Sequence, residues 1–266
     1  MKPGLLSVTF RQRSPQQIID LCVENGLQTI EWGGDVHVPH GDLAVAAEVG
    51  RNTRRHGLDV TAYGSYYELA ASPAEGLDFS SVLASAVALE TKAIRVWAGN
   101  RGSALADAAF RQAVIDDALR CADLAAAKDI RICYEYHIHT LTDTLESACE
   151  LLAATEHPFI KTLWQPTIGA SREECLAELR RLISRLHHVH AFYWWPDYSH
   201  RHPLRDGADR WSAYVQELRA HGCDPDILLE FVVGDDPASL TDDAHFLNEL
   251  LAPYRDESPK PLPGFL

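Results

Sequence analysis

Four side chains that commonly bind metals stand at the ends of four successive apolar segments in the second half of the chain. They are Glu135, Gln165, His190 and Glu230. Two carboxylates, one imidazole and one amide oxygen around one cation make a hard, doubly negative ligand set. Such a set suits Mn²⁺ or Mg²⁺, and it is also compatible with Co²⁺ or Zn²⁺. No thiolate belongs to the set, which argues against a structural zinc site.

A histidine accompanies the first of these ligands in the segment RICYEYHIH, residues 131–139. His137 stands two residues after Glu135, and alternate residues of an extended strand point to the same side. The imidazole could therefore bind a substrate hydroxyl or shuttle a proton. A hydrogen bond from His137 to a metal ligand is the alternative interpretation.

Aromatic, imidazole and guanidinium side chains follow other apolar segments and suit the C–H faces and hydroxyl groups of a sugar. The candidates for substrate binding are His37, His40, Tyr63, Tyr66, Arg95, Trp97, Trp194 and Arg201. Packing in the core or in loops is the alternative for each of them. The segment GGDVHVPHGD, residues 33–42, is too polar for packing alone, and within it His37 is preferred to His40.

Eight short segments rich in β-branched or aromatic residues precede or contain these side chains. They span residues 5–10, 29–32, 59–63, 93–97, 131–136, 160–164, 188–193 and 227–232. Segments with helical spacing of apolar residues lie between them, for example 15–26, 108–128 and 172–186. Strand followed by helix, repeated in this way, predicts a single (β/α)8 TIM barrel, an α/β fold, over residues 1–255. Residues 256–266, rich in proline, are predicted to form an irregular C-terminal tail.

The barrel explains why the candidate ligands would meet, because active sites of this architecture form at the carboxyl ends of the strands. The first strand is not followed by a glycine-rich phosphate turn, which disfavours the alternative of a doubly wound sheet. The mechanism predicted below depends on this convergence of four side chains that are distant in sequence.

Composition limits the partners. The net charge of −14 and a pI near 5.3 oppose binding to nucleic acid. Six cysteines without metal-binding spacing indicate reduced thiols. No stretch reaches the ~18 apolar residues of a membrane span. A cytoplasmic protein is therefore expected. Assembly into a homo-oligomer stays open.

From about Leu5 to Leu251 the chain resembles the xylose isomerase-like TIM barrels, a family of sugar phosphate isomerases and epimerases. The resemblance implies a divalent metal held by Glu, Asp, His and Glu after strands five to eight. Glu135, His190 and Glu230 match these positions. Gln165 stands where most relatives have Asp, which removes one negative charge and predicts weaker metal binding or a changed metal preference.

The resemblance also implies that the two ligand glutamates, Glu135 and Glu230, act as acid and base, while His137 assists. We therefore predict a metal-dependent isomerase or epimerase of a sugar or keto-sugar that reacts through a metal-stabilised enediolate. Ile168 and Pro196 occupy positions where ketose 3-epimerases carry His and Arg, so that narrower activity is not predicted. The chain also lacks a phosphate-binding nest or dense basic cluster, so a phosphorylated sugar is not expected.

Three other functions stay open. The first is a lyase on the same metal site, such as a dehydratase of a keto-inositol or an eliminating enzyme for 3-oxo-glycosides. The second is a non-catalytic barrel that binds a sugar or a partner protein. The third, an endonuclease IV-type repair enzyme, needs more His and Asp ligands and a basic groove, which the acidic composition opposes.

Overall fold

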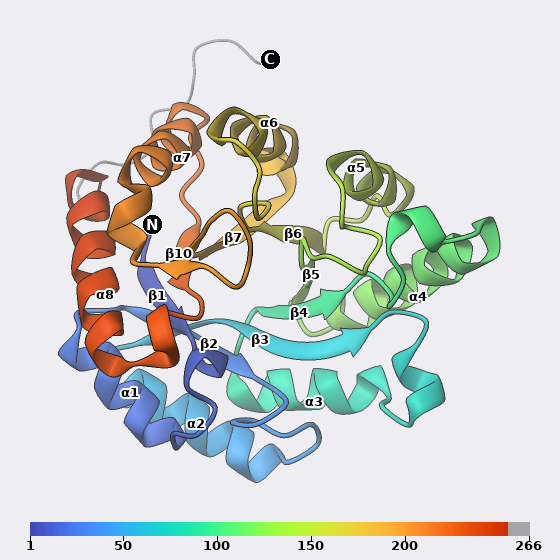
Figure 1. Ribbon diagram of the computed structural model, residues 1–266. Coiled ribbons are helices and arrows are strands. Elements are labelled where there is room, and N and C mark those ends of the chain that lie inside the picture. Colours follow the sequence, from blue (N-terminus) through green and yellow to red (C-terminus); the bar gives the residue numbers. More distant parts are fainter. Residues whose placement is uncertain (255–266) are drawn as a thin grey trace. The chain divides into compact units, whose positions relative to one another are not determined.

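A closed barrel of parallel strands forms the centre of the protein. The structure is a computed structural model that describes residues 1–254 of the 266-residue chain (Figure 1). Within these residues eight strands close the barrel in the order β1-β10-β7-β6-β5-β4-β3-β2, and eight α-helices accompany them. The predicted (β/α)8 barrel is confirmed. The predicted tail, residues 256–266, lies outside the described residues.

The elements follow one another largely in the predicted alternation. The barrel strands are β1 (Pro3–Leu6), β2 (Thr29–Gly33), β3 (Asp59–Glu68), β4 (Ala93–Trp97), β5 (Arg131–Tyr134), β6 (Ile160–Trp164), β7 (Leu186–Ala191) and β10 (Asp226–Leu229). The helices are α1 (Pro15–Glu24), α2 (Leu43–Arg55), α3 (Phe79–Leu89), α4 (Ala108–Ala126), α5 (Leu145–Ala154), α6 (Arg172–Leu182), α7 (Ala208–Ala220) and α8 (Pro237–Leu251). Two short strands, β8 (Tyr193–Trp194) and β9 (Arg201–His202), form an antiparallel ribbon after β7.

Two of the predicted strands differ most in extent from the observed ones. β1 ends at Leu6, and Ser7–Phe10 form a 3₁₀ turn, although the apolar pattern continues through them. β3 extends to Glu68, five residues beyond its predicted end, with a shift of register against β4 between Gly64 and Tyr67. Between these two residues β3 advances by three positions and β4 by one, so the shift accommodates two extra residues in β3.

The chain divides into two compact units, which are described separately. The first unit contains residues 1–30 and the chain from Trp164 onward, and the second contains residues 31–163. In the first unit β10 pairs with β1 and with β7, and Leu228 lies opposite His190. In the second unit β4 pairs with β3 and β5, and β5 pairs with β6.

Local signals fix the helix boundaries. Ser171 and Glu174 form a capping box at the start of α6, and Pro237 occupies the first turn of α8 after the N-cap Asp236. Three glycines with positive φ closely follow helix ends, namely Gly26, Gly57 and Gly222. The left-handed conformation is accessible to glycine at little cost, which explains this residue at those positions.

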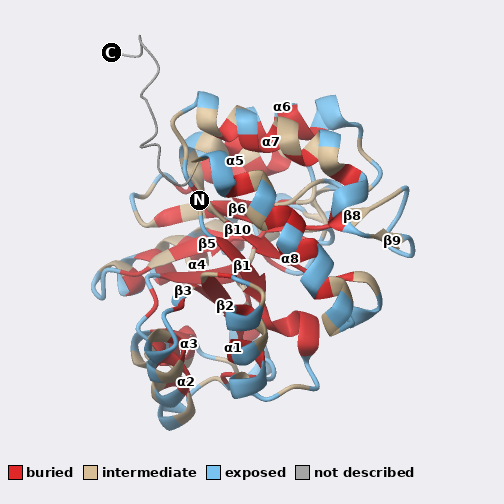
Figure 2. Cartoon of the chain, turned by 90° about the vertical axis from the view of Figure 1, so that its left-hand side faces the viewer, coloured by how far each residue is buried: buried red, intermediate tan, exposed pale blue. Residues whose placement is uncertain are grey.

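Burial follows the layers of the barrel. Figure 2 shows buried strands and helices that expose residues along one side. In the second unit α2 packs on α3 so closely that a Cβ atom at Gly50 would lie 2.5 Å from the Leu89 carbonyl oxygen. All six cysteines are free thiols, as predicted. No helix in residues 1–254 combines the length and apolar character needed to cross a membrane.

The capping box of α6 gives a test of these local signals. Replacing Ser171 with Ala removes the side-chain acceptor for the Glu174 N–H, so the free energy of unfolding should fall by about 1 kcal/mol. Urea denaturation measures this loss. Ser184→Ala, at an exposed position outside α6, should leave the unfolding free energy within about 0.5 kcal/mol of wild type. Equal effects of both variants would contradict the assignment.

Candidate metal and substrate site

The second unit contains a buried ion triad. Arg95 Nε donates to Glu31 Oε1 at 2.6 Å, and Arg95 Nη1 donates to Glu135 Oε2. Each of the three residues is at most 2% exposed. Burial lowers the pKa of Arg95, but the adjacent carboxylates raise it well above its ordinary value. The guanidinium therefore remains the counter-charge for both carboxylates.

Further hydrogen bonds fix Glu135. Trp97 Nε1 also donates to Glu135 Oε2, so one carboxylate oxygen accepts from two side chains. The Glu135 N–H donates to the Val96 carbonyl at 3.0 Å, and the Glu135 carbonyl accepts from Thr142 Oγ1. The carboxylate of Glu135 consequently has a defined orientation at the end of β5.

His137 lies on Trp97. The two rings stack with a centroid distance of 4.9 Å and an interplanar angle of 18°. His137 Nδ1 lies 2.7 Å from the Ile138 carbonyl oxygen, which can only accept, so Nδ1 carries a proton. Nε2 is then the ring atom that remains available for a bond to a substrate.

Tyr66 completes this cluster. Its ring forms a T-shaped pair with the ring of Trp97 at a centroid distance of 5.6 Å. Arg95 Cζ lies 4.5 Å from the Tyr66 ring centroid. Burial raises the pKa of Tyr66, and Arg95 partly opposes that effect. Tyr66 has a φ of 54°, unusual for a bulky residue, at the place where the β3 register shifts.

The polar segment 33–42 is fastened to β3. Tyr63 Oη donates to the Val38 carbonyl at 2.8 Å, and His40 Nε2 lies 2.7 Å from the Ser65 carbonyl oxygen. His37 is buried, and its ring forms a T-shaped pair with the ring of Trp32 at a centroid distance of 5.9 Å. These contacts order the segment, and direct binding of substrate by His37, His40 or Tyr63 stays a prediction.

The first unit brings three predicted ligands together. His190 is fully buried, and its Nδ1 lies 3.3 Å from Gln165 Oε1 and 3.6 Å from Glu230 Oε2. Atoms bound to one ion at roughly 2.0–2.2 Å stand roughly 2.8–3.6 Å apart at octahedral or tetrahedral angles. The two distances from His190 Nδ1 thus match the spacing of atoms that share one divalent cation.

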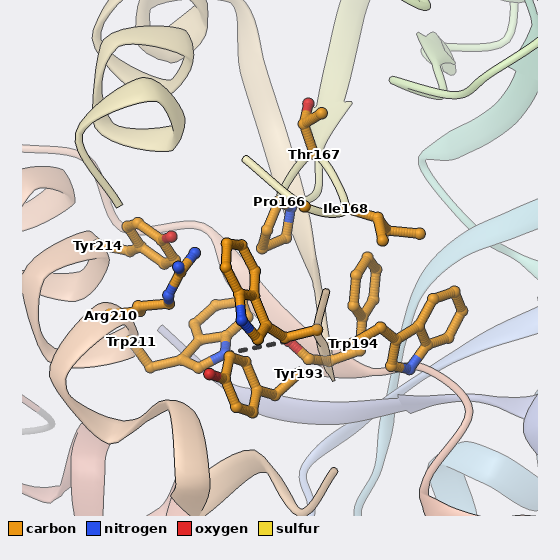
Figure 3. Close-up of a pocket in the computed structure, with 11 residues that line it drawn as sticks. Pro166, Thr167, Ile168, Tyr193, Trp194, Arg210, Trp211 and Tyr214 are labelled. Carbon is orange, nitrogen blue, oxygen red and sulfur yellow. Dashed lines mark hydrogen bonds between the residues drawn. The ribbon is translucent and has the colours of Figure 1, made fainter. Parts of the chain in front are cut away.

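Aromatic residues follow these ligands in sequence and line a pocket in the same unit. Figure 3 shows its lining from three places, the segment after β6 (Pro166, Thr167, Ile168), the ribbon after β7 (Tyr193, Trp194) and α7 (Arg210, Trp211, Tyr214). Trp211 Nε1 donates to the Phe192 carbonyl at 3.2 Å, which ties α7 to the chain beyond His190.

The predicted cation Arg201 lies near the same ribbon. Its Cζ is 5.0 Å from the Trp194 ring centroid and 5.1 Å from that of Phe231, and its Nη1 contacts Asp235 Oδ1 at 3.1 Å. Arg205, four residues later in the chain, instead pairs with Glu249 at 2.6 Å. Of the two arginines, Arg201 therefore lies closer to the residues that follow Glu230.

A family model for the xylose isomerase-like TIM barrel matches residues 19–250. The chain belongs to this family. A 3-dehydroshikimate dehydratase of Bacillus anthracis is 28% identical over 204 residues, which cover 70% of this chain and 71% of the relative. The names of this and other relatives support the prediction that the protein is an enzyme.

Solved structures of the xylose isomerase-like fold resemble the chain over nearly its whole length. The probable 3-DHS dehydratase AsbF of Bacillus anthracis has a TM-score of 0.78 and 23% identity, covering 93% of this chain and 99% of that one. The 3-keto-D-glucoside 4-epimerase YcjR of E. coli has a TM-score of 0.73 and 19% identity, covering 95% and 99%.

Metal ions occur in solved structures of this fold. A structure of the IOLI protein holds zinc, with a TM-score of 0.74 and 14% identity, covering 97% of this chain and 100% of that one. A Mycobacterium smegmatis barrel holds magnesium, with a TM-score of 0.69 and 13% identity, covering 95% and 97%.

Sequence reasoning assigned no role to several residues of this xylose isomerase-like barrel. Glu31 and the pairing of Arg95 with two carboxylates were missed, as was His188, a buried residue whose ring lies 5.3 Å from that of His190. The alternation of side chains along a strand could have indicated His188. It is two residues from His190 and shares one side of the strand with it, as Arg95 does with Trp97.

The buried triad predicts a pH-dependent stability. Arg95→Met leaves the carboxylates of Glu31 and Glu135 buried without their cation, so the free energy of unfolding should fall by about 3–5 kcal/mol at pH 8. Their pKa values in the folded variant should then exceed the unfolded values. Protonation favours the folded variant, so its stability should recover as pH falls to 5.

Urea denaturation of wild type and variant at both pH values measures this effect. The double variant Arg95→Met/Glu31→Gln removes one buried charge and should regain part of the loss at pH 8. An equal loss at pH 5 and pH 8 would show that packing, rather than charge, explains the role of Arg95.

Proposed function

We propose that the protein is a metal-dependent lyase that removes water from a cyclic β-hydroxy ketone. The spacing of Gln165, His190 and Glu230 supports a metal site, and it is the observation that carries the proposal. The similarity to a 3-dehydroshikimate dehydratase favours dehydration over the isomerase reaction expected from the sequence. A dehydratase of a keto-inositol falls within the same reaction class.

The proposed ligands are Glu135, Gln165, His190 and Glu230. Two of them, His190 and Glu230, have donor atoms 3.6 Å apart in the first unit. The strands that precede the four ligands, β5, β6, β7 and β10, are consecutive in the barrel order. Mn²⁺ or Mg²⁺ suits this mostly oxygen set best, and Co²⁺ or Zn²⁺ is compatible. A bound divalent ion would stabilise negative charge on the ketone oxygen.

Proton transfer is assigned to Glu230 and His137. Glu135 Oε2 accepts from Arg95 and Trp97, and such donors stabilise the carboxylate and disfavour its protonation. Glu230 therefore takes the proton from the carbon next to the ketone. His137 Nε2 protonates the departing β-hydroxyl group, which leaves as water.

An epimerase is the second candidate, which the fold shared with the 3-keto-D-glucoside 4-epimerase keeps open. Both reactions begin with removal of the same proton. An epimerase then returns a proton to the opposite face of the carbon, whereas a lyase expels the hydroxyl group. Mass spectrometry distinguishes them, because only the lyase product has lost water.

The reaction is tested with Mn²⁺-loaded protein and 3-dehydroshikimate, a keto-inositol or a 3-keto-glucoside in deuterated water. Loss of water from a substrate is expected, and Glu230→Gln should lower kcat roughly 10²–10⁴-fold while the thermal unfolding temperature is kept. The matched control Glu156→Gln changes an exposed glutamate and should keep full activity. Deuterium uptake without loss of water would indicate the epimerase, and normal activity of Glu230→Gln would remove its role as base.

The neutral ligand gives a separate test. Gln165→Asp restores the negative charge typical of the family position and should lower the Kd for Mn²⁺ about tenfold, as measured by calorimetry. Gln216→Asp, at an exposed position on α7, is the control for added charge and should change the Kd less than twofold. Unchanged affinity of Gln165→Asp would exclude Gln165 from the ligand set.

A further inference from the structure

A second pocket lies in the first unit, beside the last proposed ligand. It has a volume of about 420 Å³ and is formed by residues 8–13 after β1, Gln17 of α1, and Phe231 and Asp235 after β10. Ligand-binding pockets commonly enclose ~300–1,000 Å³. Phe231 directly follows Glu230, so the pocket lies next to the residue assigned as base.

The pocket is basic although the chain is acidic. Arg11 and Arg13 line it, and Arg201 contacts both Phe231 and Asp235 at its edge. Asp235 is the single acidic side chain among the described lining residues, and it is paired with Arg201. In a chain with a net charge of −14, such a concentration of guanidinium groups favours an anionic ligand.

Phe231 is held in an unusual conformation within this pocket. Its φ of 49° lies in the left-handed region, which disfavours bulky residues, and its N–H donates to Thr9 Oγ1 at 3.0 Å. The ring lies 5.7 Å from Arg11 Cζ and 5.1 Å from Arg201 Cζ. A half-buried aromatic ring close to two guanidinium groups complements a flat ring that carries an anionic substituent.

We infer that this pocket binds a substrate carboxylate and that Arg11 is its principal partner. Arg11 is exposed and donates to the Val8 carbonyl at 3.3 Å through Nη1, and a guanidinium has five N–H donors, so the same group can also bind a carboxylate. The substrate is then a cyclic hydroxy-keto acid rather than a neutral sugar. This inference deepens the proposed function and rests on it for the keto group only.

Binding of shikimate and of its methyl ester to the Mn²⁺-loaded protein tests the inference without turnover, because neither compound has a ketone. Calorimetry should show that wild type binds the acid at least about tenfold more tightly than the ester. Arg11→Gln should abolish this preference, and Arg11→Lys should restore part of it. Arg51→Gln, at an exposed position on α2, should keep the full preference.

Equal or undetectable binding of acid and ester by wild type would overturn the inference, and so would a full preference in Arg11→Gln. Turnover of 3-dehydroshikimate is measured in parallel. If wild type prefers the acid through Arg11 but removes water from no substrate, the carboxylate pocket stands and the proposed lyase function fails. If water is lost while Arg11→Gln leaves the KM for the acid unchanged, the lyase function stands and the pocket inference fails.

Discussion

A guanidinium buried between two carboxylates constrains the side chains at the strand ends in the unit formed by residues 31–163. Moving three charges out of water is costly, and the cost is offset only when each charge meets its partner with good geometry. Arg95 meets this condition toward Glu31 and Glu135. Because Trp97 donates to the same oxygen of Glu135 and Tyr66 covers the guanidinium, movement of any one of these side chains would disturb the others.

The buried polar cluster of the first unit contains fewer charged groups than the triad. His190 has no exposed surface, yet its neighbours Gln165 and Glu230 together carry a single negative charge. An aspartate at position 165 would place a second carboxylate within the same short distances, which raises repulsion when no cation is bound. The amide avoids that repulsion and still offers an oxygen. The expected consequence is a site that is ordered without metal and binds metal less strongly.

Local sequence patterns predicted most of the fold. They failed where the same apolar pattern is compatible with either a strand or a turn. The segments 93–97 and 160–164 coincide with β4 and β6, since short β-branched runs between helices leave little choice. Ser7–Phe10 have the same apolar character as a strand but form a 3₁₀ turn, and Thr9 bonds to the N–H of the distant residue Phe231. Arg95 was predicted as a candidate for substrate binding, and its two carboxylate partners, 64 and 40 residues away, could not be chosen from spacing alone.

The proposed metal ligands and the residues suited to determine substrate specificity occupy different positions along the chain. A stacked or aromatic side chain follows within a few residues of Glu135, His190 and Glu230, as His137, Phe192 and Phe231 do. The proposed ligands stand where strands end and are held by backbone hydrogen bonds, for example the bond from the Glu230 N–H to the Ala191 carbonyl. The following residues lie in loops and can change without disturbing those bonds. Barrels with similar strands can therefore carry a dehydratase in one relative and an epimerase in another, so the loop arginines are more informative about the substrate than the fold itself.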